Sequence, residues 1–275
     1  MAQYSLQDLL TLMARLRDPQ DGCPWDLKQT WESIVPHTLE EAYEVADCIE
    51  RGDLEHLQEE LGDLLFQVVY YSRFGEEENR FDFHQVVDGL TRKLIRRHPH
   101  VFPEGTLESR VGDQKVNELE VNNTWETLKA EERKVKQQAT SILDGIPANL
   151  PAVTRALKLQ KRAARVGFDW GEAYQVLDKL EEELAEIREA LAEGNQAAVA
   201  DEVGDFLFAS VNLARHLKVD PEAAVRSTNR KFERRFKYVE QQSALNHPNQ
   251  QVPLETLEGY WQEAKRKESP DAPVT

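Results

Sequence analysis

The spacing of apolar and polar positions predicts helices along most of the chain. Apolar residues between positions 6 and 16 recur every three or four residues, as on one face of a helix, and Pro19 and Gly22 end that run. A second apolar stripe of the same period covers positions 54–68. Nothing alternates with period two for long enough to make a convincing strand. The sequence therefore predicts an all-α fold.

Two segments are apolar on nearly every helix face. They are positions 64–71, Leu-Leu-Phe-Gln-Val-Val-Tyr-Tyr, and positions 206–211, Phe-Leu-Phe-Ala-Ser-Val. A helix that is apolar all round is normally buried, so we expect both segments to lie in the protein interior.

The chain also contains an internal repeat, the signature of a tandem duplication. Lys93 and Arg97 have counterparts in Lys231 and Arg235, and Trp125 and Lys129 have counterparts in Trp261 and Lys265. Seven further pairs of identical residues are separated by one constant offset of 142 without a gap: Glu41 and Glu183, Glu44 and Glu186, Gly52 and Gly194, Glu60 and Glu202, Gly62 and Gly204, Asp63 and Asp205, and Phe66 and Phe208. We expect two helical-bundle domains, 1–136 and 152–275, joined by a linker at 137–151 that contains Gly145, Pro147 and Pro151.

Each repeat contains a predicted turn between two helices. Gly52 suits the left-handed position after a helix, and Asp53 suits the N-cap of the next helix. Gly194 and Asn195 supply the same chemistry in the second repeat. Each repeat should therefore form an antiparallel helical hairpin.

The hairpin should gather four carboxylates. Glu44 and Glu60 lie eight residues before and after Gly52, and Glu41 and Asp63 lie eleven residues before and after it. Within each helix the two acids are three residues apart and share a face. The second repeat has the same spacing, so two clusters are expected: Glu41, Glu44, Glu60 and Asp63, and Glu183, Glu186, Glu202 and Asp205.

Converging carboxylates repel one another unless a cation neutralises them. Oxygen ligands suit hard divalent ions, and Mg²⁺ is the usual choice beside phosphates, with Mn²⁺ as an alternative. The clusters contain no His or Cys, which argues against zinc. We interpret the eight acids as metal ligands; the alternative is an exposed acidic face on surface helices.

Composition narrows the classes of partner. Charged residues make up 31% of the chain and the formal net charge is −16, which argues against a general nucleic-acid binder and fits an anionic membrane surface poorly. We expect no membrane span, because no apolar run approaches ~20 residues. With no visible signal peptide and with Cys23 and Cys48 as free thiols, a cytoplasmic location is expected.

These motifs resemble a known family. Glu-Glu-x-x-Glu, a spacer and then Glu-x-x-Asp is the signature of the all-α NTP pyrophosphatases, and further segments are similar to the MazG family within that superfamily. The resemblance implies that the chain cleaves nucleoside triphosphates to the monophosphate and pyrophosphate, with broad specificity, and that it forms a homodimer. The MazG-like segments are Gly22–Asp26, Glu60–Val69, Arg96–Phe102, Val166–Trp170 and Lys231–Phe236.

The resemblance also implies roles for residues of the second repeat. Glu183, Glu186, Glu202 and Asp205 would hold Mg²⁺. The nucleotide would be bound by six residues: Lys179, Glu182, Lys231, Arg235, Trp261 and Lys265. Some relatives carry Lys where Ala198 stands, so one contact is missing here.

The reaction needs charge neutralisation and an oriented water. We choose Glu182 to orient or deprotonate that water, because it neighbours the metal ligands without being assigned to the metal. Lys179 is matched in the first repeat by His37, which is mostly neutral at pH 7. The second repeat should therefore carry most of the turnover.

Two alternatives stay open at this stage. One is a narrow-specificity dNTPase of the same superfamily, such as a dUTPase. The other is a non-catalytic helical interaction protein whose acids bind only a structural ion.

Overall fold

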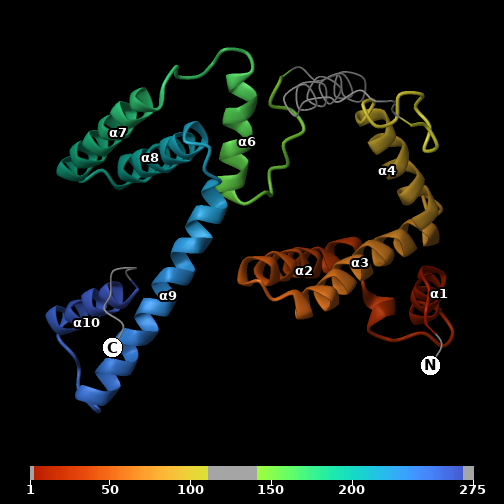
Figure 1. Ribbon diagram of the computed structural model, residues 1–275, viewed down its shortest axis with the longest axis horizontal. Helices are drawn as coiled ribbons and strands as arrows, with labels where there is room; N and C mark the ends of the chain where they lie inside the picture. The colour runs from red at the N-terminus through yellow and green to blue at the C-terminus, as the bar shows by residue number, and fades with distance from the viewer. Residues whose placement is uncertain (1–2, 111–140, 269–275) are drawn as a thin grey trace. The chain divides into compact units, whose positions relative to one another are not determined.

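The computed structural model describes residues 3–110 and 141–268, which fall within two compact units, Met1–Lys136 and Gln137–Thr275 (Figure 1). The described residues are largely helical and contain no β-strand. The predicted all-α fold is confirmed. Of the expected linker 137–151, the described part, 141–151, groups with the second unit, where Arg162 donates a hydrogen bond to the carbonyl of Ile142 (3.0 Å).

In the first unit, α2 and α3 form an antiparallel hairpin, and α1 and α4 pack against α3. The described elements are α1 (Leu6–Leu16), a short 3₁₀ helix (Asp26–Lys28), α2 (Trp31–Arg51), α3 (Leu54–Glu77) and α4 (Phe83–Arg97).

In the second unit, α7 and α8 form the corresponding hairpin. Helix α6 packs against α8 and α9, and α10 packs along α9. The described helices are α6 (Ala152–Ala164), α7 (Ala173–Glu193), α8 (Gln196–His216), α9 (Pro221–Asn246) and α10 (Leu254–Lys267).

Both hairpin turns have the predicted chemistry. Gly52 and Gly194 adopt left-handed backbone conformations, with φ of 71° and 70°, which residues that carry a Cβ rarely adopt. The next helices are capped by Asp53, whose side chain accepts a hydrogen bond from the His56 backbone N–H, and by Asn195 in the same manner. The two glycines therefore set the register in which the acids of each hairpin face one another.

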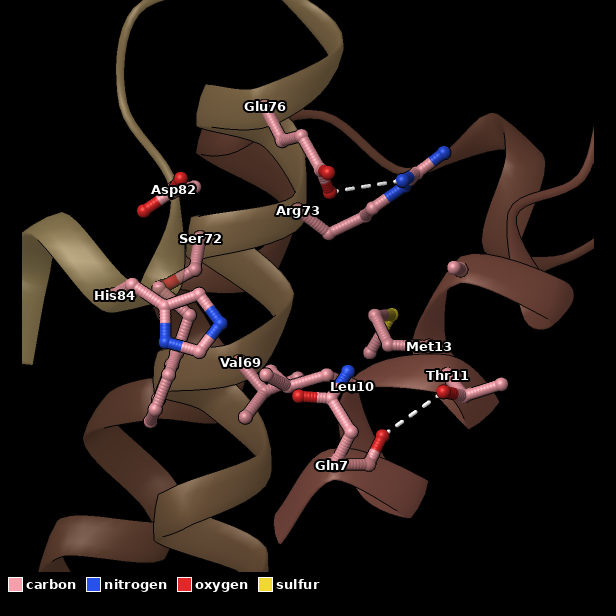
Figure 2. Close-up of a pocket in the computed structure, with 12 residues that line it drawn as sticks. Gln7, Leu10, Thr11, Met13, Val69, Ser72, Arg73, Glu76, Asp82 and His84 are labelled. Atoms are coloured by element: carbon pink, nitrogen blue, oxygen red, sulfur yellow. Dashed lines mark hydrogen bonds and ion pairs between the residues drawn. The ribbon is translucent and has the colours of Figure 1, made fainter.

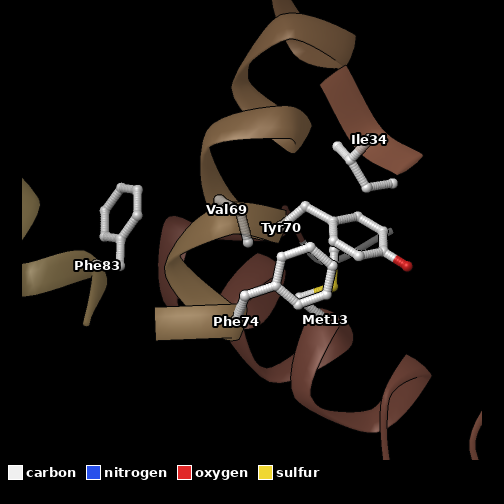
Figure 3. Close-up of a cluster of buried hydrophobic side chains, with 6 residues drawn as sticks. All are labelled: Met13, Ile34, Val69, Tyr70, Phe74 and Phe83. Atoms are coloured by element: carbon white, nitrogen blue, oxygen red, sulfur yellow. The ribbon is translucent and has the colours of Figure 1, made fainter. Parts of the chain in front are cut away.

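The first unit has a core of large side chains. Met13, Ile34, Val69, Tyr70, Phe74 and Phe83 form one buried cluster (Figure 3). The Tyr70 ring packs edge-on against Phe74, with ring centroids 5.2 Å apart. These contacts fix α1 and α2 against α3.

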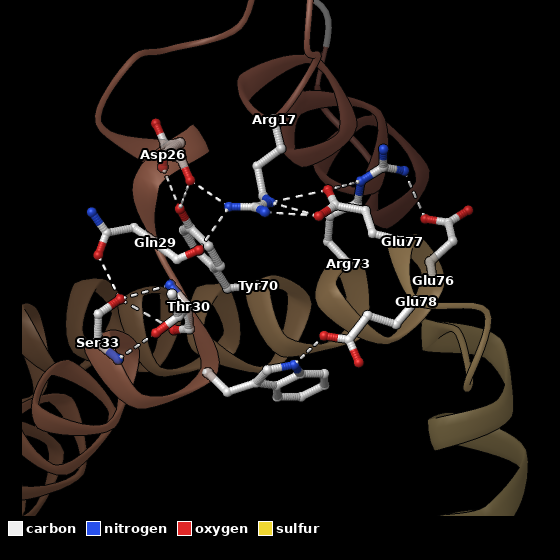
Figure 4. A network of polar contacts seen from close by, with 11 residues as sticks. Arg17, Asp26, Gln29, Thr30, Ser33, Tyr70, Arg73, Glu76, Glu77 and Glu78 are labelled. Carbon is white, nitrogen blue, oxygen red and sulfur yellow. Dashed lines mark hydrogen bonds and ion pairs between the residues drawn. The ribbon is translucent and has the colours of Figure 1, made fainter.

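A polar network holds the segment between α1 and α2 against α3 (Figure 4). Arg17 donates three hydrogen bonds to the carboxylate of Glu77, at 3.0, 3.2 and 2.7 Å, and one to the backbone carbonyl of Asp26. The Tyr70 hydroxyl donates to Asp26 Oδ1 (2.9 Å). Tyr70 is therefore fixed both by packing and by its hydroxyl.

The expected burial of the two all-apolar segments holds for one face only: Val69 and Tyr70 in α3 and Ala209 and Val211 in α8 are buried, but other side chains of both segments are exposed. Leu65 and Val68 in α3 are each 40% exposed, and Leu207 and Phe208 in α8 are 59% and 44% exposed. Within the part of the chain that is described, no helix covers these side chains, so each hairpin buries one face and leaves another open. No helix found in the described ranges combines the length and apolar character of a membrane span.

Candidate active site

Each hairpin brings three of its predicted acids together. Single carboxylate oxygens of Glu41, Glu60 and Asp63 lie within 4.8 Å of one another. In the second unit the same is true of Glu183, Glu186 and Glu202. Both arrangements can place several oxygens around one divalent ion.

The remaining two acids lie beside these groups. Glu44 lies beside Glu41 and Glu60. Burial is the largest cause that raises the pKa of Glu41 and of Glu60, and the neighbouring carboxylates, Glu44 among them, raise both pKa values further. Asp205 lines a cavity together with Glu183. The structure thus groups three acids of each hairpin, with Glu44 beside the first group and Asp205 in the lining of the cavity that Glu183 also borders.

Electrostatic repulsion is visible in both clusters. Burial and then the charge of Glu202 raise the pKa of Glu186, against the lowering effect of Lys179. Burial and then the charge of Asp63 raise the pKa of Glu41. A divalent cation would relieve both effects by favouring the ionised carboxylates.

Lys179 and Glu183 distinguish the cluster of the second unit. Lys179 Nζ lies 2.8 Å from Glu182 Oε1 and 2.9 Å from Glu183 Oε1. Glu183 is 4% exposed, and its Oε2 is buried without a hydrogen-bond partner among the described residues. A buried carboxylate oxygen without a partner is costly unless a cation or donor completes it.

A cavity of about 420 Å³ adjoins this cluster. Its lining is mainly apolar and comes from α6, α7, α8, the loop that follows α6, and Leu143 in the segment before α6. Lys179, Glu183 and Asp205 border it on the acidic side. The loop contributes the aromatic side chains of Phe168 and Trp170.

The loop is tied to α8 through Asp169. Its Oδ1 accepts a hydrogen bond from Arg215 and lies 3.0 Å from His216 Nε2. Burial opposes ionisation of this carboxyl, but the hydrogen bonds from Arg215 and His216 outweigh it and lower the pKa of Asp169. This ion pair keeps the aromatic wall of the cavity in place.

The first unit is filled at the corresponding point. By the repeat offset of 142, Tyr70 is the equivalent of Asn212, which lines the cavity of the second unit. Tyr70 is 1% exposed and lies in the buried cluster of Figure 3. A bulky ring thus occupies the position at which the second unit is hollow.

The first unit has a cavity elsewhere, of about 260 Å³ (Figure 2). It lies between α1, α3 and the start of α4, beside Thr11, Ser72 and His84. None of the four predicted ligands of this unit lines it.

The predicted phosphate and nucleotide contacts of the last two helices are grouped with one another. Arg235 in α9 donates to Glu268 Oε2 (2.7 Å), and its guanidinium lies 5.8 Å from the centre of the Trp261 ring in α10. Lys231 and Lys265 are exposed on the same two helices.

Within one chain, this α9–α10 group is separate from the acids of α7 and α8. Helix α9 has 26 residues, roughly 39 Å at the standard rise, and α10 lies along its far half (Figure 1). None of Lys231, Arg235, Trp261 and Lys265 lines the cavity. The structure therefore does not bring these four predicted nucleotide contacts to the cavity of the same chain, and their role in nucleotide binding stays a prediction. The first-repeat counterparts Trp125 and Lys129 lie outside the described residues.

Sequence reasoning missed the polar residues behind the acids. Gln160, Asn212 and Arg215 line the cavity, yet each reads as an ordinary helix residue in the sequence. The repeat itself offers one signal: Asn212 corresponds to Tyr70 at the offset of 142 that relates the seven identical pairs.

The fold and these clusters define a class: an all-α protein built from two carboxylate-bearing helical hairpins. The sequence profile of the MazG nucleotide pyrophosphohydrolase domain matches residues 29–102 and 172–240, one match over each hairpin. The chain belongs to this family.

Individual relatives agree with the profile. The chain is 50% identical to the nucleoside triphosphate pyrophosphohydrolase of Escherichia coli K12 over 94% of its own length and 97% of the relative. It is 39% identical to the nucleoside triphosphate pyrophosphohydrolase/pyrophosphatase MazG of Thermotoga maritima, over 94% of this chain and 95% of the relative. A Mycolicibacterium smegmatis nucleoside triphosphate pyrophosphohydrolase is 37% identical over 59% of this chain and 47% of its own.

Proposed function

We propose that the protein is a Mg²⁺-dependent nucleoside triphosphate pyrophosphohydrolase that accepts many bases and works mainly through its second unit. The observation that carries the proposal is the contact between the acidic cluster and a cavity in that unit. Carboxylates that can bind a cation beside a space for a nucleoside suit a metal-bound triphosphate. The names of the full-length relatives support the same reaction.

The donor set suits Mg²⁺, or Mn²⁺ in its place. Glu183, Glu186, Glu202 and Asp205 offer only carboxylate oxygens, and Glu183 Oε2 is a buried acceptor without a partner. A bound Mg²⁺ would neutralise charge on the phosphates and favour attack by water. In the first unit, Glu41, Glu44, Glu60 and Asp63 would hold an ion in the same way.

Protein side chains would orient the water and the phosphates. Lys179 places a positive charge between Glu182 and Glu183, at the border of the cavity, where it can contact a phosphate oxygen. Glu182 is 59% exposed and held by Lys179, which leaves its second oxygen able to accept a proton from water. Comparison of Glu182→Gln with Glu183→Gln tests this division. If metal affinity falls equally in both variants, Glu182 is a ligand and another group is the base.

A homodimer is part of the proposal. The basic and aromatic side chains of α9 and α10 do not line the cavity beside the acids of their own chain, and large apolar side chains of α3 and α8 are exposed. A second copy could cover the apolar faces and bring its Lys231 and Arg235 to the phosphates. One chain has a mass of 31.6 kDa, and sedimentation velocity should therefore give twice that mass.

Product analysis tests the reaction. Hydrolysis should release the nucleoside monophosphate and pyrophosphate; a nucleoside diphosphate and orthophosphate as first products would contradict the proposal. Reaction in ¹⁸O-labelled water identifies the phosphorus that accepts the water oxygen. A panel of ribo- and deoxynucleotides separates broad from narrow specificity, and binding of Mg²⁺ without any turnover would favour the non-catalytic interaction protein.

A further inference from the structure

The cavity of the second unit contains polar groups that the metal cluster does not require. Its volume of about 420 Å³ lies within the ~300–1,000 Å³ range of small-molecule sites. The lining combines aromatic and aliphatic surface with a few polar side chains, which is the usual composition of such a site. The acids occupy one side of it, so the rest of the lining needs its own explanation.

Gln160 presents an acceptor without a partner. The side chain is 7% exposed, and Nε2 donates to the backbone carbonyl of Phe208 (2.8 Å). That carbonyl can only accept, so it fixes the orientation of the amide. Oε1 is then the free atom, buried and without a hydrogen-bond partner among the described residues. Such an acceptor is expected to be satisfied by a donor that is absent from the chain itself.

Asn212 supplies a donor to the same cavity. It is 3% exposed, and Oδ1 accepts from Arg215 Nε (2.9 Å). Because Oδ1 accepts that bond, Nδ2 is the group through which this side chain can donate. Gln160 thus offers a buried acceptor without a partner, and Asn212 offers a donor on a buried side chain, in the wall of one largely apolar space.

We propose that this cavity holds the nucleobase of the substrate, and that Gln160 and Asn212 determine base preference by hydrogen-bonding its polar edge. This inference rests on the proposed function, since the acids place the phosphates at the open side. Every nucleobase offers N–H donors and lone-pair acceptors on its edge, and its flat faces suit the rings of Phe168 and Trp170. One donor and one acceptor rank bases without excluding any, which matches broad specificity with a preference.

The first unit supplies a matched control. Gln67 is also buried, at 6% exposed, and its Oε1 also has no partner among the described residues. It does not line the cavity of Figure 2, and Tyr70 fills the position that corresponds to Asn212. Gln67→Met and Gln160→Met therefore make the same chemical change, the first outside the lining of both cavities described above and the second in the wall of one.

The test measures base binding without hydrolysis. Four neutral nucleosides, adenosine, guanosine, cytidine and uridine, are followed by saturation-transfer NMR with EDTA present, so that neither metal nor phosphate contributes. Wild type and Gln67→Met should bind at least one nucleoside with the same affinity. Gln160→Met and Asn212→Leu should weaken that binding roughly 10-fold or more. Circular dichroism and thermal melting establish that each variant is folded.

A second arm measures kcat/KM for the four triphosphates. Gln160→Met should compress the ratio between the best and worst nucleotide by roughly 10-fold, with pyrophosphate still released. The inference is overturned if wild type binds no nucleoside, or if folded Gln160→Met keeps wild-type binding and wild-type ratios. If wild type binds nucleosides through Gln160 but hydrolyses no triphosphate, the proposed function fails and the base site stands.

Discussion

The two units have the same acidic hairpin but different interiors behind it. In the first unit the covered apolar residues include Met13, Ile34, Tyr70 and Phe74, and they fill the space against α3. In the described part of the second unit the buried apolar residues are small: Ala156, Val176, Ala190, Ala209, Val211, Val239 and Ala264. Small side chains leave room for the cavity beside Glu183.

This difference separates metal binding from nucleotide binding. The acids need only the hairpin register, which both glycine turns provide. A nucleoside also needs space behind the acids, and that space is present in the second unit and occupied by Tyr70 in the first. A duplicated motif can therefore keep one part of its chemistry while packing removes another.

Removal of metal should have the largest effect. Because both catalysis and charge neutralisation depend on the acids, exhaustive EDTA treatment should reduce hydrolysis to background, and Mg²⁺ or Mn²⁺ should restore it. Bound Mn²⁺ counted by electron paramagnetic resonance should fall by about half in a Glu41→Ala, Glu44→Ala variant, because on this proposal each acidic cluster would hold its own ion. Full turnover in EDTA would remove the metal from the mechanism.

Filling the cavity should convert the second unit into a copy of the first. Asn212→Tyr places a ring where Tyr70 stands in the first unit and should lower kcat/KM about 100-fold through lost nucleotide binding. Mn²⁺ binding should persist, since the acids are unchanged.

The reciprocal change, Tyr70→Asn, serves as the control. It should destabilise the first unit by about 3 kcal/mol, because it removes a buried ring and the hydrogen bond to Asp26. Activity per folded molecule should stay within about 2-fold. Wild-type nucleotide binding by Asn212→Tyr would show that the cavity is not used.

Lys179 is the next difference between the acidic clusters. Lys179→His gives the second unit the residue that the first unit has at the same offset, His37. Loss of a fixed positive charge at a phosphate should lower kcat/KM about 10-fold at pH 8, with part of it recovered near pH 6 as the histidine becomes protonated. The matched change His37→Lys should leave turnover near wild type. Equal effects of the two substitutions would mean that the units share the work.

The smallest effect concerns the loop that carries Trp170. The pKa of Asp169 is lowered in the folded state, so its stabilisation is present above the unfolded pKa of ~3.9 and is lost as pH falls through the lower folded value. Asp169→Asn should therefore lower the unfolding free energy by about 1 kcal/mol at pH 7. The unfolding free energies of both proteins, measured by urea titration, should converge as the pH falls below the folded pKa of Asp169; a difference that stays constant with pH would rule out the ion pair as its source.

The sequence could predict the hairpins because their determinants are local. Gly52, Asp53 and the carboxylates three residues apart specify a turn and a helix face through backbone conformation alone. The sequence could not predict the cavity, because it arises from side-chain volumes on three helices and a loop. Periodicity also overstated the burial of Leu207 and Phe208, since it cannot tell a side chain covered by its own chain from one left open.

The central claim is that the second unit carries the turnover although both units bind metal. The most direct test compares Glu183→Ala, Glu186→Ala with Glu41→Ala, Glu44→Ala, using proteins shown to be folded and of equal oligomeric state. We predict that the Glu183 pair lowers hydrolysis at least about 100-fold and that the Glu41 pair leaves it within about 3-fold of wild type. Loss of hydrolysis in the Glu41 pair with near-normal hydrolysis in the Glu183 pair would contradict the account.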